Sequence, residues 1–409
     1  MNRQNAKSAL TPIDEALETL LKSLVPIEGE ETVPLAEAIG RVLAVSIVAP
    51  MNVPPHASSA MDGYAVRSAD ITTVPVELPV TQRIPAGCVG ETLNAGEAAR
   101  IFTGAPLPPG ADAVVMQENT QQQADRVLIL RSALAGENSR PAGEDIAIGT
   151  QVFALGDRLK AQDIGVLASL GATQVQVRRR LRIALLTTGD ELVSPGEGLG
   201  PGQIYNSNYY TLLALLNALG AEVLDVGAVE DNLATTVSAL EKVADSVDCI
   251  LSTGGVSVGE EDHVRSAVEL LGSIDLWRLA IKPGKPFASG KVKNSIFFGL
   301  PGNPVSAFVT FVVLVRPSLL KLLGCSRIDH QSYFLQAGFS APVSGNRQEY
   351  LRVVIDNSSG ESKLLPFANQ SSGVSASLSF ADGLAIVPAN TAVAQGDTLR
   401  FIPFSELLY

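Results

Sequence analysis

The sequence is poor in the side chains that form disulfides and soft metal sites. It has only three cysteines, Cys88, Cys249 and Cys325, and three histidines, with no metal-ligand spacing among them. An odd number of widely separated cysteines argues against disulfides and for a reducing compartment. Because thiolate and imidazole ligands are scarce, any bound metal should be held by oxygen atoms, which favours Mg²⁺ over zinc.

Positive charge is also scarce. The chain has 42 acidic and 30 basic residues, a net charge of −12, and its one dense basic patch is Arg178-Arg179-Arg180 with Arg182. Nucleic-acid affinity comes from clustered Lys and Arg, so no nucleic-acid partner is expected, and the patch is interpreted as a solvated edge between domains. The sequence shows no apolar leader and no apolar run of transmembrane length, which predicts a cytoplasmic protein without a membrane partner.

The length of the chain indicates several domains. At 409 residues it exceeds what a single hydrophobic core usually supports. The pattern predicts an α/β multidomain fold in four parts. A helical and extended N-terminal domain is expected from residues 1–48 and 142–180, interrupted by a β-rich module at 49–141. A mostly parallel, three-layer α/β domain at 181–327 and a small barrel-like β domain at 328–409 complete the chain.

Strands and helices alternate regularly from Leu181 onward, which is typical of a mostly parallel sheet with helices on both faces. Strands are predicted at 182–187, 222–229, 248–252, 276–281 and 295–299, and helices at 209–219, 233–244, 261–271 and 304–323. Near the N-terminus, Thr11 is expected to cap a helix with Pro12 in its first turn, and a short second helix is expected at 34–44.

Charged residues and glycines follow each strand of the predicted sheet. The loops read TGDE at 188–191, EDN at 230–232, GGVSVGEED at 254–262, KPGKP at 282–286 and PGNP at 301–304. Ligands of open α/β sheets bind beyond the carboxyl ends of the strands, so we expect these loops to form one site. Taken singly, each loop also has a structural explanation as a turn, a helix cap or a solvated lysine.

The residue types in these loops suit a phosphate and a cation. Gly254 and Gly255 let backbone N–H groups approach an oxyanion, and lysines supply charge. Asn303 is expected to cap a helix that starts at Pro304, leaving the next amides free for an anion. An oxygen-only acid cluster supplies Mg²⁺ ligands. The combination suggests cleavage or transfer at a phosphate bond.

A competing motif lies in the third loop. Gly255-Val256-Ser257-Val258-Gly259 matches G-x-S-x-G, the nucleophile elbow of α/β-hydrolases, between a strand and a helix. An esterase would need a downstream histidine as base, which leaves His263 and His330. His263 is on the next helix and His330 is in a linker, so neither suits a triad.

Three further segments are distinctive: two lie within the β-rich module, and one lies at its end. SSAMDGYAV at 58–66 places Asp62 at a tight turn, and RIFTGAP at 100–106 places Thr103 before a bend. An acidic turn containing Asp145 follows at 140–145. A β-turn explains each of them on its own.

In this order, the segments resemble the MoeA family of molybdopterin molybdenumtransferases, whose eukaryotic relatives include the gephyrin E domain. The matching stretches are SSAMDGYAV, RIFTGAPLP, AGEDI, TTGDEL, STGGVSVGEEDH, AIKPGKPFASG and GLPGNPVSA. The resemblance implies the MoeA/MogA-like fold for the central domain. It also implies insertion of molybdate into adenylylated molybdopterin with Mg²⁺-dependent release of AMP. The family's cleft lies between two subunits, which implies a homodimer.

The resemblance, read beside the loops, gives the candidate residues. The catalytic set is Asp62, Thr103, Glu191, Asp231, Asp262 and Lys282, and the metal ligands among them are Glu191, Asp231 and Asp262. The substrate-binding set is Asp145, Gly254, Gly255, Ser257, Arg278, Lys285, Pro301, Gly302, Asn303, Pro304, Arg352 and Ser371. Arg278 stands where the family pattern leads us to expect a lysine, which changes a point charge into a planar fork.

Two other functions stay open at this stage. A molybdopterin adenylyltransferase would resemble the central domain alone and would consume ATP. A scaffold, similar to gephyrin in receptor clustering, would bind the pterin without catalysing its conversion. For the molybdenumtransferase itself, the candidate protein partners besides a second subunit are a molybdopterin adenylyltransferase and proteins that mature molybdoenzymes. No residue distinguishes molybdate from tungstate, since both are tetrahedral dianions.

Overall fold

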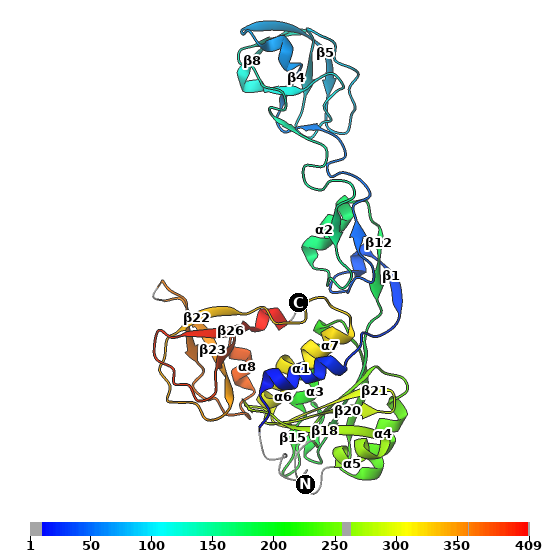
Figure 1. Ribbon diagram of the computed structural model, residues 1–409, viewed down its shortest axis with the longest axis vertical. Coiled ribbons are helices and arrows are strands. Elements are labelled where there is room, and N and C mark those ends of the chain that lie inside the picture. Colours follow the sequence, from blue (N-terminus) through cyan, green and yellow to red (C-terminus); the bar gives the residue numbers. More distant parts are fainter. Residues whose placement is uncertain (1–9, 256–262, 359, 408–409) are drawn as a thin grey trace.

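The computed structural model describes residues 10–255, 263–358 and 360–407. Its parts are arranged as an arm on a base (Figure 1). The base holds the central α/β domain and the C-terminal β domain, and the arm holds a small β1/β12/α2 module followed by a β-rich module at the far end. The expected multidomain α/β fold is confirmed.

The central domain is built on a six-stranded sheet of order β16-β13-β17-β21-β20-β18. Its first four strands, β16 (Glu222–Val229), β13 (Arg182–Thr188), β17 (Cys249–Thr253) and β21 (Ser295–Leu300), are parallel. Strands β20 (Pro286–Val292) and β18 (Gly272–Arg278) continue it in antiparallel pairs. The near-continuous apolar runs of β13, β17 and β21 bury side chains on both faces, as a sheet covered on both sides requires.

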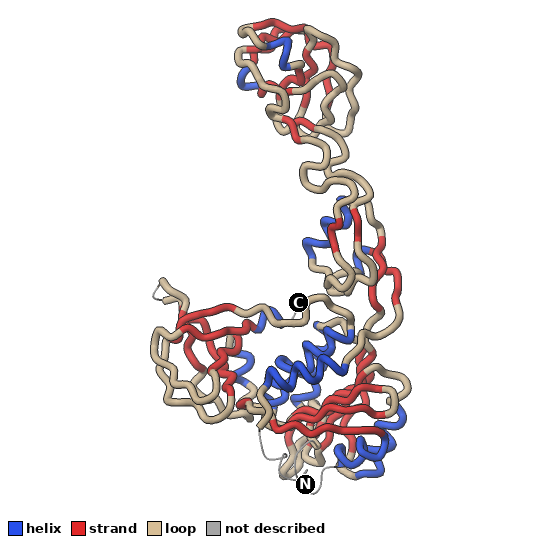
Figure 2. The backbone as a smooth tube through the Cα atoms, in the orientation of Figure 1, coloured by secondary structure: helices blue, strands red, loops and turns tan. Residues whose placement is uncertain are grey.

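Helices cover both faces of this sheet (Figure 2). On one face lie α3 (Ser207–Ala218) and the continuous helix formed by α6 (Pro304–Thr310), the π-helical turn η5 (Phe311–Val315) and α7 (Arg316–Leu322). On the other lie α4 (Leu233–Val243) and α5 (His263–Leu271). The three-layer prediction is therefore confirmed.

The fourth strand differs from the prediction. Residues 272–278 form β18 instead of 276–281, and β20, which was not predicted, pairs with it along its whole length. The segment 286–292 reads as a turn because it contains small residues and a glycine, and only its position between two strands makes it extended. Because β18 runs in the same direction as β21, the loop 279–285 still lies at the carboxyl edge of the sheet.

Helix Pro304–Leu322 has the length and hydropathy of a membrane span, which the sequence reading missed. However, 89% of its apolar window is buried inside the protein. It serves as the core helix of the central domain, where it contacts residues of α1 and the sheet.

The N-terminal segment departs from two expectations. Helix α1 (Ile13–Ser23) packs against α7 and η5 of the central domain, so it belongs to the base, although it was predicted within the domain of residues 1–48 and 142–180. Thr11 does not cap this helix. Its N–H donates to the carbonyl of Arg278 at 2.8 Å, and its carbonyl accepts from Ala280, which leaves Pro12 at the cap position.

The small arm module is discontinuous in sequence. It pairs β1 (Glu30–Pro34) with β12 (Gln174–Arg178) and β2 (Ile47–Val48) with β11 (Gln151–Phe153), beside α2 (Ala161–Ser169). The helix expected at 34–44 is absent apart from the 3₁₀ turn η2 (Leu35–Glu37). Beyond it, Gly40 and Leu43 donate backbone hydrogen bonds to Leu159 and Asp157, so tertiary pairing replaces helix there.

The module at the arm's end is a curled mixed sheet of order β7-β4-β6-β5-β9-β8. Its strands are β4 (Gly63–Val66), β5 (Val76–Ile84), β6 (Ala98–Ile101), β7 (Ala113–Met116), β8 (Thr120–Gln123) and β9 (Arg126–Ile129). Two segments of the chain connect this module to the rest of the arm. The antiparallel pair β3 (Ser58–Ser59) and β10 (Ser139–Arg140) joins these two segments.

The C-terminal domain is a closed five-stranded barrel. Its strands pair in the order β23-β24-β22-β26-β25 and close through β23–β25. They are β22 (Tyr333–Ala337), β23 (Gln348–Asp356), β24 (Lys363–Pro366), β25 (Gly383–Val387) and β26 (Thr398–Pro403). The two-residue β19 (Ile281–Lys282) of the central domain joins β23 and docks the barrel onto the base.

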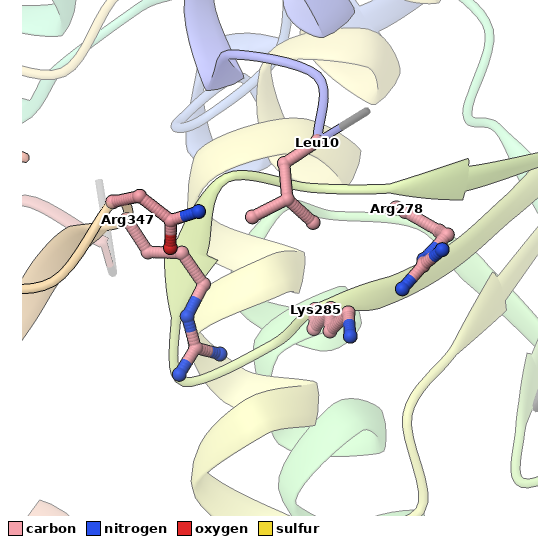
Figure 3. A pocket seen from close by; sticks show the side chains of 5 residues that line it. Leu10, Arg278, Lys285 and Arg347 are labelled. Carbon is pink, nitrogen blue, oxygen red and sulfur yellow. The ribbon is translucent and has the colours of Figure 1, made fainter. Parts of the chain in front are cut away.

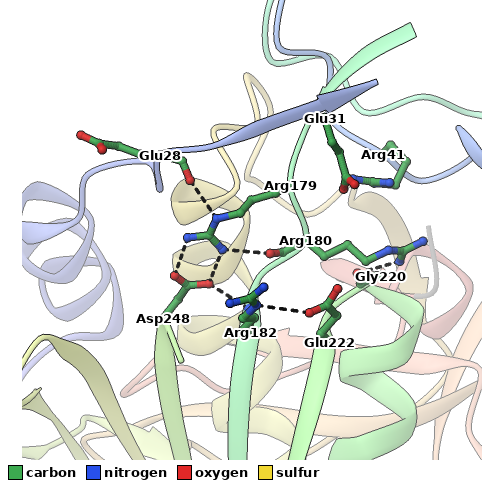
Figure 4. A network of polar contacts seen from close by, with 9 residues as sticks. All are labelled: Glu28, Glu31, Arg41, Arg179, Arg180, Arg182, Gly220, Glu222 and Asp248. Atoms are coloured by element: carbon green, nitrogen blue, oxygen red, sulfur yellow. Dashed lines mark hydrogen bonds and ion pairs between the residues drawn. The ribbon is translucent and has the colours of Figure 1, made fainter. Parts of the chain in front are cut away.

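The basic patch at 178–182 clamps the arm to the base (Figure 4). Arg179 donates through both Nη atoms to the carboxylate of Asp248 at 2.8 Å and through Nε to the carbonyl of Glu28. Burial opposes ionisation of Asp248, yet hydrogen bonds from Arg179 and Arg182 outweigh it and lower the pKa of Asp248. The patch is an interdomain edge as expected, but it is an ordered ion-pair network instead of a solvated one.

Candidate functional site

The loops at the carboxyl edge of the central sheet lie next to one another in strand order. Strand β13 is flanked by β16 and β17, and β21 follows β17. The backbone N–H of Asp231, after β16, donates to the carboxylate of Asp190, after β13, at 3.2 Å. The side chains of Glu191 and Asp231 are exposed. The predicted meeting of these two acidic loops is therefore seen directly.

The glycine pair after β17 is held against the neighbouring loops. Gly254 has φ +88°, and a β carbon there would lie 2.7 Å from the carbonyl oxygen of Thr188. At Gly255, with φ +61°, a β carbon would lie 2.4 Å from a methyl group of Val264. Both the positive φ and the close approach require glycine. Both glycines are half-buried, and the N–H of Gly254 donates to the carbonyl of Leu300 at 3.2 Å, so that N–H is not free for an oxyanion, which differs from the prediction.

Asn208 is a residue of this edge that the sequence reading missed. Its amide donates to the hydroxyl of Thr253 at 3.1 Å and to the carbonyl of Gly302 at 2.6 Å, which ties the ends of β17 and β21 to helix α3. Nearby, Asn206 caps α3 and donates to buried Thr187 at 2.7 Å. The capping pattern Asn206-Ser207-Asn208 before an apolar helix was a usable signal for both.

The Pro-Gly-Asn-Pro turn begins a helix as expected, with Asn303 at the cap and Pro304 in the first turn. The amides of that turn are less available than predicted. The N–H of Val305 donates to the carbonyl of Ser372 in the C-terminal domain at 3.0 Å. The barrel therefore covers part of the positive helix end. Pro301 is buried and Gly302 is exposed. A β carbon at Gly302 would lie 3.9 Å from the α carbon of Gly254, so the two loops are adjacent.

A cationic pocket lies between the central domain and the barrel (Figure 3). It has a volume of about 390 Å³ and is lined by Leu10, Arg278, Lys285, Asn346 and Arg347. Figure 3 shows the guanidinium groups of Arg278 and Arg347 on either side of Lys285. Within the described ranges, none of these three cations has an acidic partner within ion-pair distance. Three unneutralised cations around one cavity favour an anion.

Arg347 was not predicted from the sequence. It directly precedes β23 of the barrel, and a lone arginine in a Gly-Asn-Arg-Gln segment carries no recognisable signal. Its Nη1 lies 3.5 Å from the carbonyl oxygen of Ile281, beside the loop that holds Lys285. Only the docking of the barrel brings it to the pocket.

Lys282 does not line this pocket. Its Nζ donates to the carboxylate of Glu349 at 3.0 Å, across the β19–β23 pairing. The lysine is half exposed, whereas the side chain of Glu349 is 18% exposed. Lys282 therefore sits at the same junction, with an acidic partner from the barrel.

The two residues carried over to the last domain have different surroundings. Arg352 is 1% exposed and donates to the hydroxyl of Ser377 and to the carbonyls of Asn369 and Ser371. Desolvation by burial lowers its pKa. Arg352 thus holds the loop 369–377, while Ser371 is exposed on that loop.

Asp62 and Thr103 form a pair at the arm's end. The carboxylate of Asp62 accepts from the backbone N–H of Thr103 at 2.8 Å and from its hydroxyl at 2.7 Å. These two hydrogen bonds lower the pKa of Asp62. Asp62 directly precedes β4, and Figure 1 shows that β4 lies at the opposite end of the molecule from the central sheet. Asp145 is exposed on the connection between the arm modules, where its N–H donates to Val53.

Some predicted residues cannot be placed. Ser257 and Asp262 lie outside the described residues, as does most of the G-x-S-x-G motif. In the part of the chain that the structure describes, no group of three or more acids, histidines or cysteines could hold a metal. Glu191 and Asp231 still lie on adjacent loops and offer oxygen donors only, which fits Mg²⁺.

The histidines do not support the hydrolase interpretation. His263 is the first residue of α5 and directly follows the segment outside the described ranges, so its relation to Ser257 is not part of the described structure. His330 is partly buried, its Nε2 donates to the carbonyl of Val312 at 2.7 Å, and its Nδ1 accepts from Arg316 at 3.4 Å. Burial and the Arg316 charge lower the pKa of His330 to about 4. Both ring nitrogens are engaged in structure, so His330 is not a general base.

Fold and site define a multidomain protein with a three-layer α/β domain and a cationic pocket beside the carboxyl edge of its sheet. A model described as a probable molybdopterin binding domain matches residues 184–321. Models for the MoeA N-terminal region, domains I and II, and the MoeA C-terminal region, domain IV, match residues 11–171 and 335–404. The chain belongs to the MoeA family.

Known relatives agree with this assignment. A protein of Haemophilus influenzae named molybdopterin molybdenumtransferase is 42% identical over 76% of this chain and 78% of its own length. Molybdopterin molybdenumtransferase 2 of Mycobacterium tuberculosis is 38% identical over 90% and 94%. The crystal structure of the molybdopterin biosynthesis MoeA protein from Pyrococcus horikoshii covers 97% of this chain and 100% of its own, with a TM-score of 0.84 and 30% identity.

Proposed function

We propose that the chain is a molybdopterin molybdenumtransferase that inserts molybdate into adenylylated molybdopterin and releases AMP. The observation that carries the proposal is the pocket of Arg278, Lys285 and Arg347, because three cations without acidic partners suit a dianionic oxyanion. The names of the relatives support the same reaction. The anion-binding pocket adjoins a domain of the molybdopterin-binding family.

The glycines, lysines and arginines at this edge of the sheet each have a different role in the proposal. Gly254 and Gly255 have no side chain, so a phosphate can come close to the backbone there, while Lys282 and Lys285 neutralise and orient it. Arg278 and Arg347 each offer a planar fork that can donate two hydrogen bonds to one oxyanion. Positioning of this kind brings the dithiolene sulfurs and the metal oxyanion together and accounts for a large part of such a rate enhancement.

We also propose Mg²⁺ as the cofactor, held by Glu191 and Asp231 together with Asp262. Carboxylate oxygens are the ligands that Mg²⁺ prefers, and the hydrogen bond between the 190 and 231 loops supports their joint use. When bound, the ion stabilises negative charge on the leaving phosphate.

The active unit in this proposal is a cytoplasmic homodimer. The Asp62–Thr103 pair lies on the arm, at the far end of the chain from the cationic pocket, so one chain cannot bring the two together in this arrangement. A second subunit would supply the pair to the cleft. The buried or unpaired cysteines suit a reducing compartment.

The test is an incubation with adenylylated molybdopterin, Mg²⁺ and molybdate in which AMP and protein-bound molybdenum are followed together. Arg347→Ala and Lys285→Ala should each lower kcat/KM by at least about tenfold, the usual loss for a charge-assisted contact. Lys291→Ala, at the other end of β20, should leave it unchanged.

Other outcomes favour the other functions. ATP consumption with accumulation of adenylylated product would favour a molybdopterin adenylyltransferase. Pterin binding without turnover would favour a scaffold. Unchanged kinetics in both the Arg347 and Lys285 variants would refute the role given to the pocket.

A further inference from the structure

Glu349 is the one acid that the barrel places in contact with the proposed site lysines in the described chain. Its carboxylate accepts from Lys282 Nζ at 3.0 Å, and its side chain is only 18% exposed. It was not among the residues singled out from the sequence. A carboxylate that faces a site for anions needs a reason, because it opposes the binding of the ligand.

The backbone fixes where this carboxylate points. Ile281 and Lys282 pair in parallel with Gln348 and Glu349, and the N–H of Gln348 donates to the carbonyl of Ala280 at 2.8 Å. Arg347 directly precedes the paired residues and lines the cationic pocket, whereas Glu349 lies opposite Lys282 in the pairing. One short segment of the barrel therefore delivers a cation to the pocket and an anion to Lys282.

We infer that Glu349 is a positioning residue that holds the Lys282 ammonium at the domain junction and orients it for the reaction. This inference rests on the proposed function. A lysine side chain has several rotatable bonds and is half exposed here, so without a partner its ammonium would sample many positions. The carboxylate restricts it, and the neighbouring cations Arg278, Lys285 and Arg347 remain free for the oxyanion.

Positioning and simple domain docking give opposite effects on anion binding. If Glu349 positions Lys282, its removal takes one negative charge from beside the pocket and leaves the three lining cations in place. Oxyanion binding then stays equal or becomes up to about fivefold tighter, while turnover falls. If Glu349 only docks the barrel, its removal also displaces Arg347, and oxyanion binding weakens together with turnover.

The experiment uses the full chain with Glu349→Ala and Glu349→Gln, and Glu361→Gln as control. Glu361 pairs with Lys363 at 3.6 Å on the exposed surface of the same barrel. Calorimetry measures binding of inorganic molybdate and, separately, of inorganic phosphate, so that a site for the metal oxyanion is distinguished from one for a phosphate group. The transfer assay then gives kcat and KM.

We expect Glu349→Ala to lower kcat by about tenfold or more while oxyanion affinity is kept or increased. Glu349→Gln should recover part of kcat, because its amide oxygen still accepts from Lys282, and Glu361→Gln should match the wild type. Parallel loss of affinity and kcat, or a kcat that stays at the wild-type value, would overturn the inference alone. A wild-type protein that neither binds the oxyanions nor releases AMP would overturn the proposed function as well.

Discussion

The partly buried His330 leads to a quantitative prediction about proton binding. Desolvation, followed by repulsion from Arg316, lowers the pKa of His330 from 6.5 to about 4. The folded protein therefore keeps this imidazole neutral at pH values where the unfolded chain is protonated. Because the folded pKa is the lower one, the free energy of unfolding falls as pH drops below 6.5, and the loss levels off below about 4.

The size of the effect follows from the difference between the two pKa values. The folded pKa of about 4 lies far enough below 6.5 for a maximal loss of about 3 kcal/mol, of which about 1.4 kcal/mol is reached at pH 5.5. Such a loss is a substantial part of the stability of an ordinary domain. Carboxylates such as Asp248 add their own losses only at lower pH, because the pKa of that group is lowered.

The direct assay is a ¹³C-edited NMR titration of the imidazole groups. The chain has only three histidines, and His330→Asn identifies the signal of interest. Its signal should stay in the neutral form with protonated Nε2 down to about pH 5. Urea unfolding of the wild type and of His330→Asn at pH 7.5 and 5.5 then tests the linkage, with the variant showing the smaller loss. A His330 signal that titrates between pH 6 and 7 would refute the reasoning about burial.

Three further predictions follow from the site and the clamp. Gly254→Ala should lower stability by at least about 1 kcal/mol and weaken pterin binding, measured by thermal unfolding and fluorescence titration, because alanine is strained at φ +88°. Thr103→Ala should shift the acid limb of the kcat/KM profile to higher pH, since it removes one of the hydrogen bonds that lower the pKa of Asp62; an unmoved limb would contradict this role. Arg179→Lys should cost about 1–2 kcal/mol in urea unfolding, because lysine cannot reproduce the two-pronged contact with Asp248, and small-angle scattering should show a wider range of arm positions.

The sequence by itself determined the central domain and the edge where ligands bind. Strand and helix patterns alternate along this part of the sequence, which predicted its helices and a mostly parallel sheet. Because the strands are parallel, the glycine-rich and acidic loops that follow them lie at one edge of the sheet. Gly254 could be singled out because a positive φ is a local property of its turn, although the close approach of Thr188, which also requires glycine, comes from the fold. The Asp62 and Thr103 turns were also visible as local motifs, although their contact was not.

Only the tertiary structure decided which charges meet. Lys282 and Glu349 are 67 positions apart, and neither has a neighbour in sequence that predicts the pair. Arg347 reaches the pocket because a two-residue strand pairing docks the barrel, and the segment 286–292 becomes a strand because it fills a place in the sheet. Periodicity reports which face of an element is buried, but it carries no information about the partner, so contacts between domains had to come from the fold.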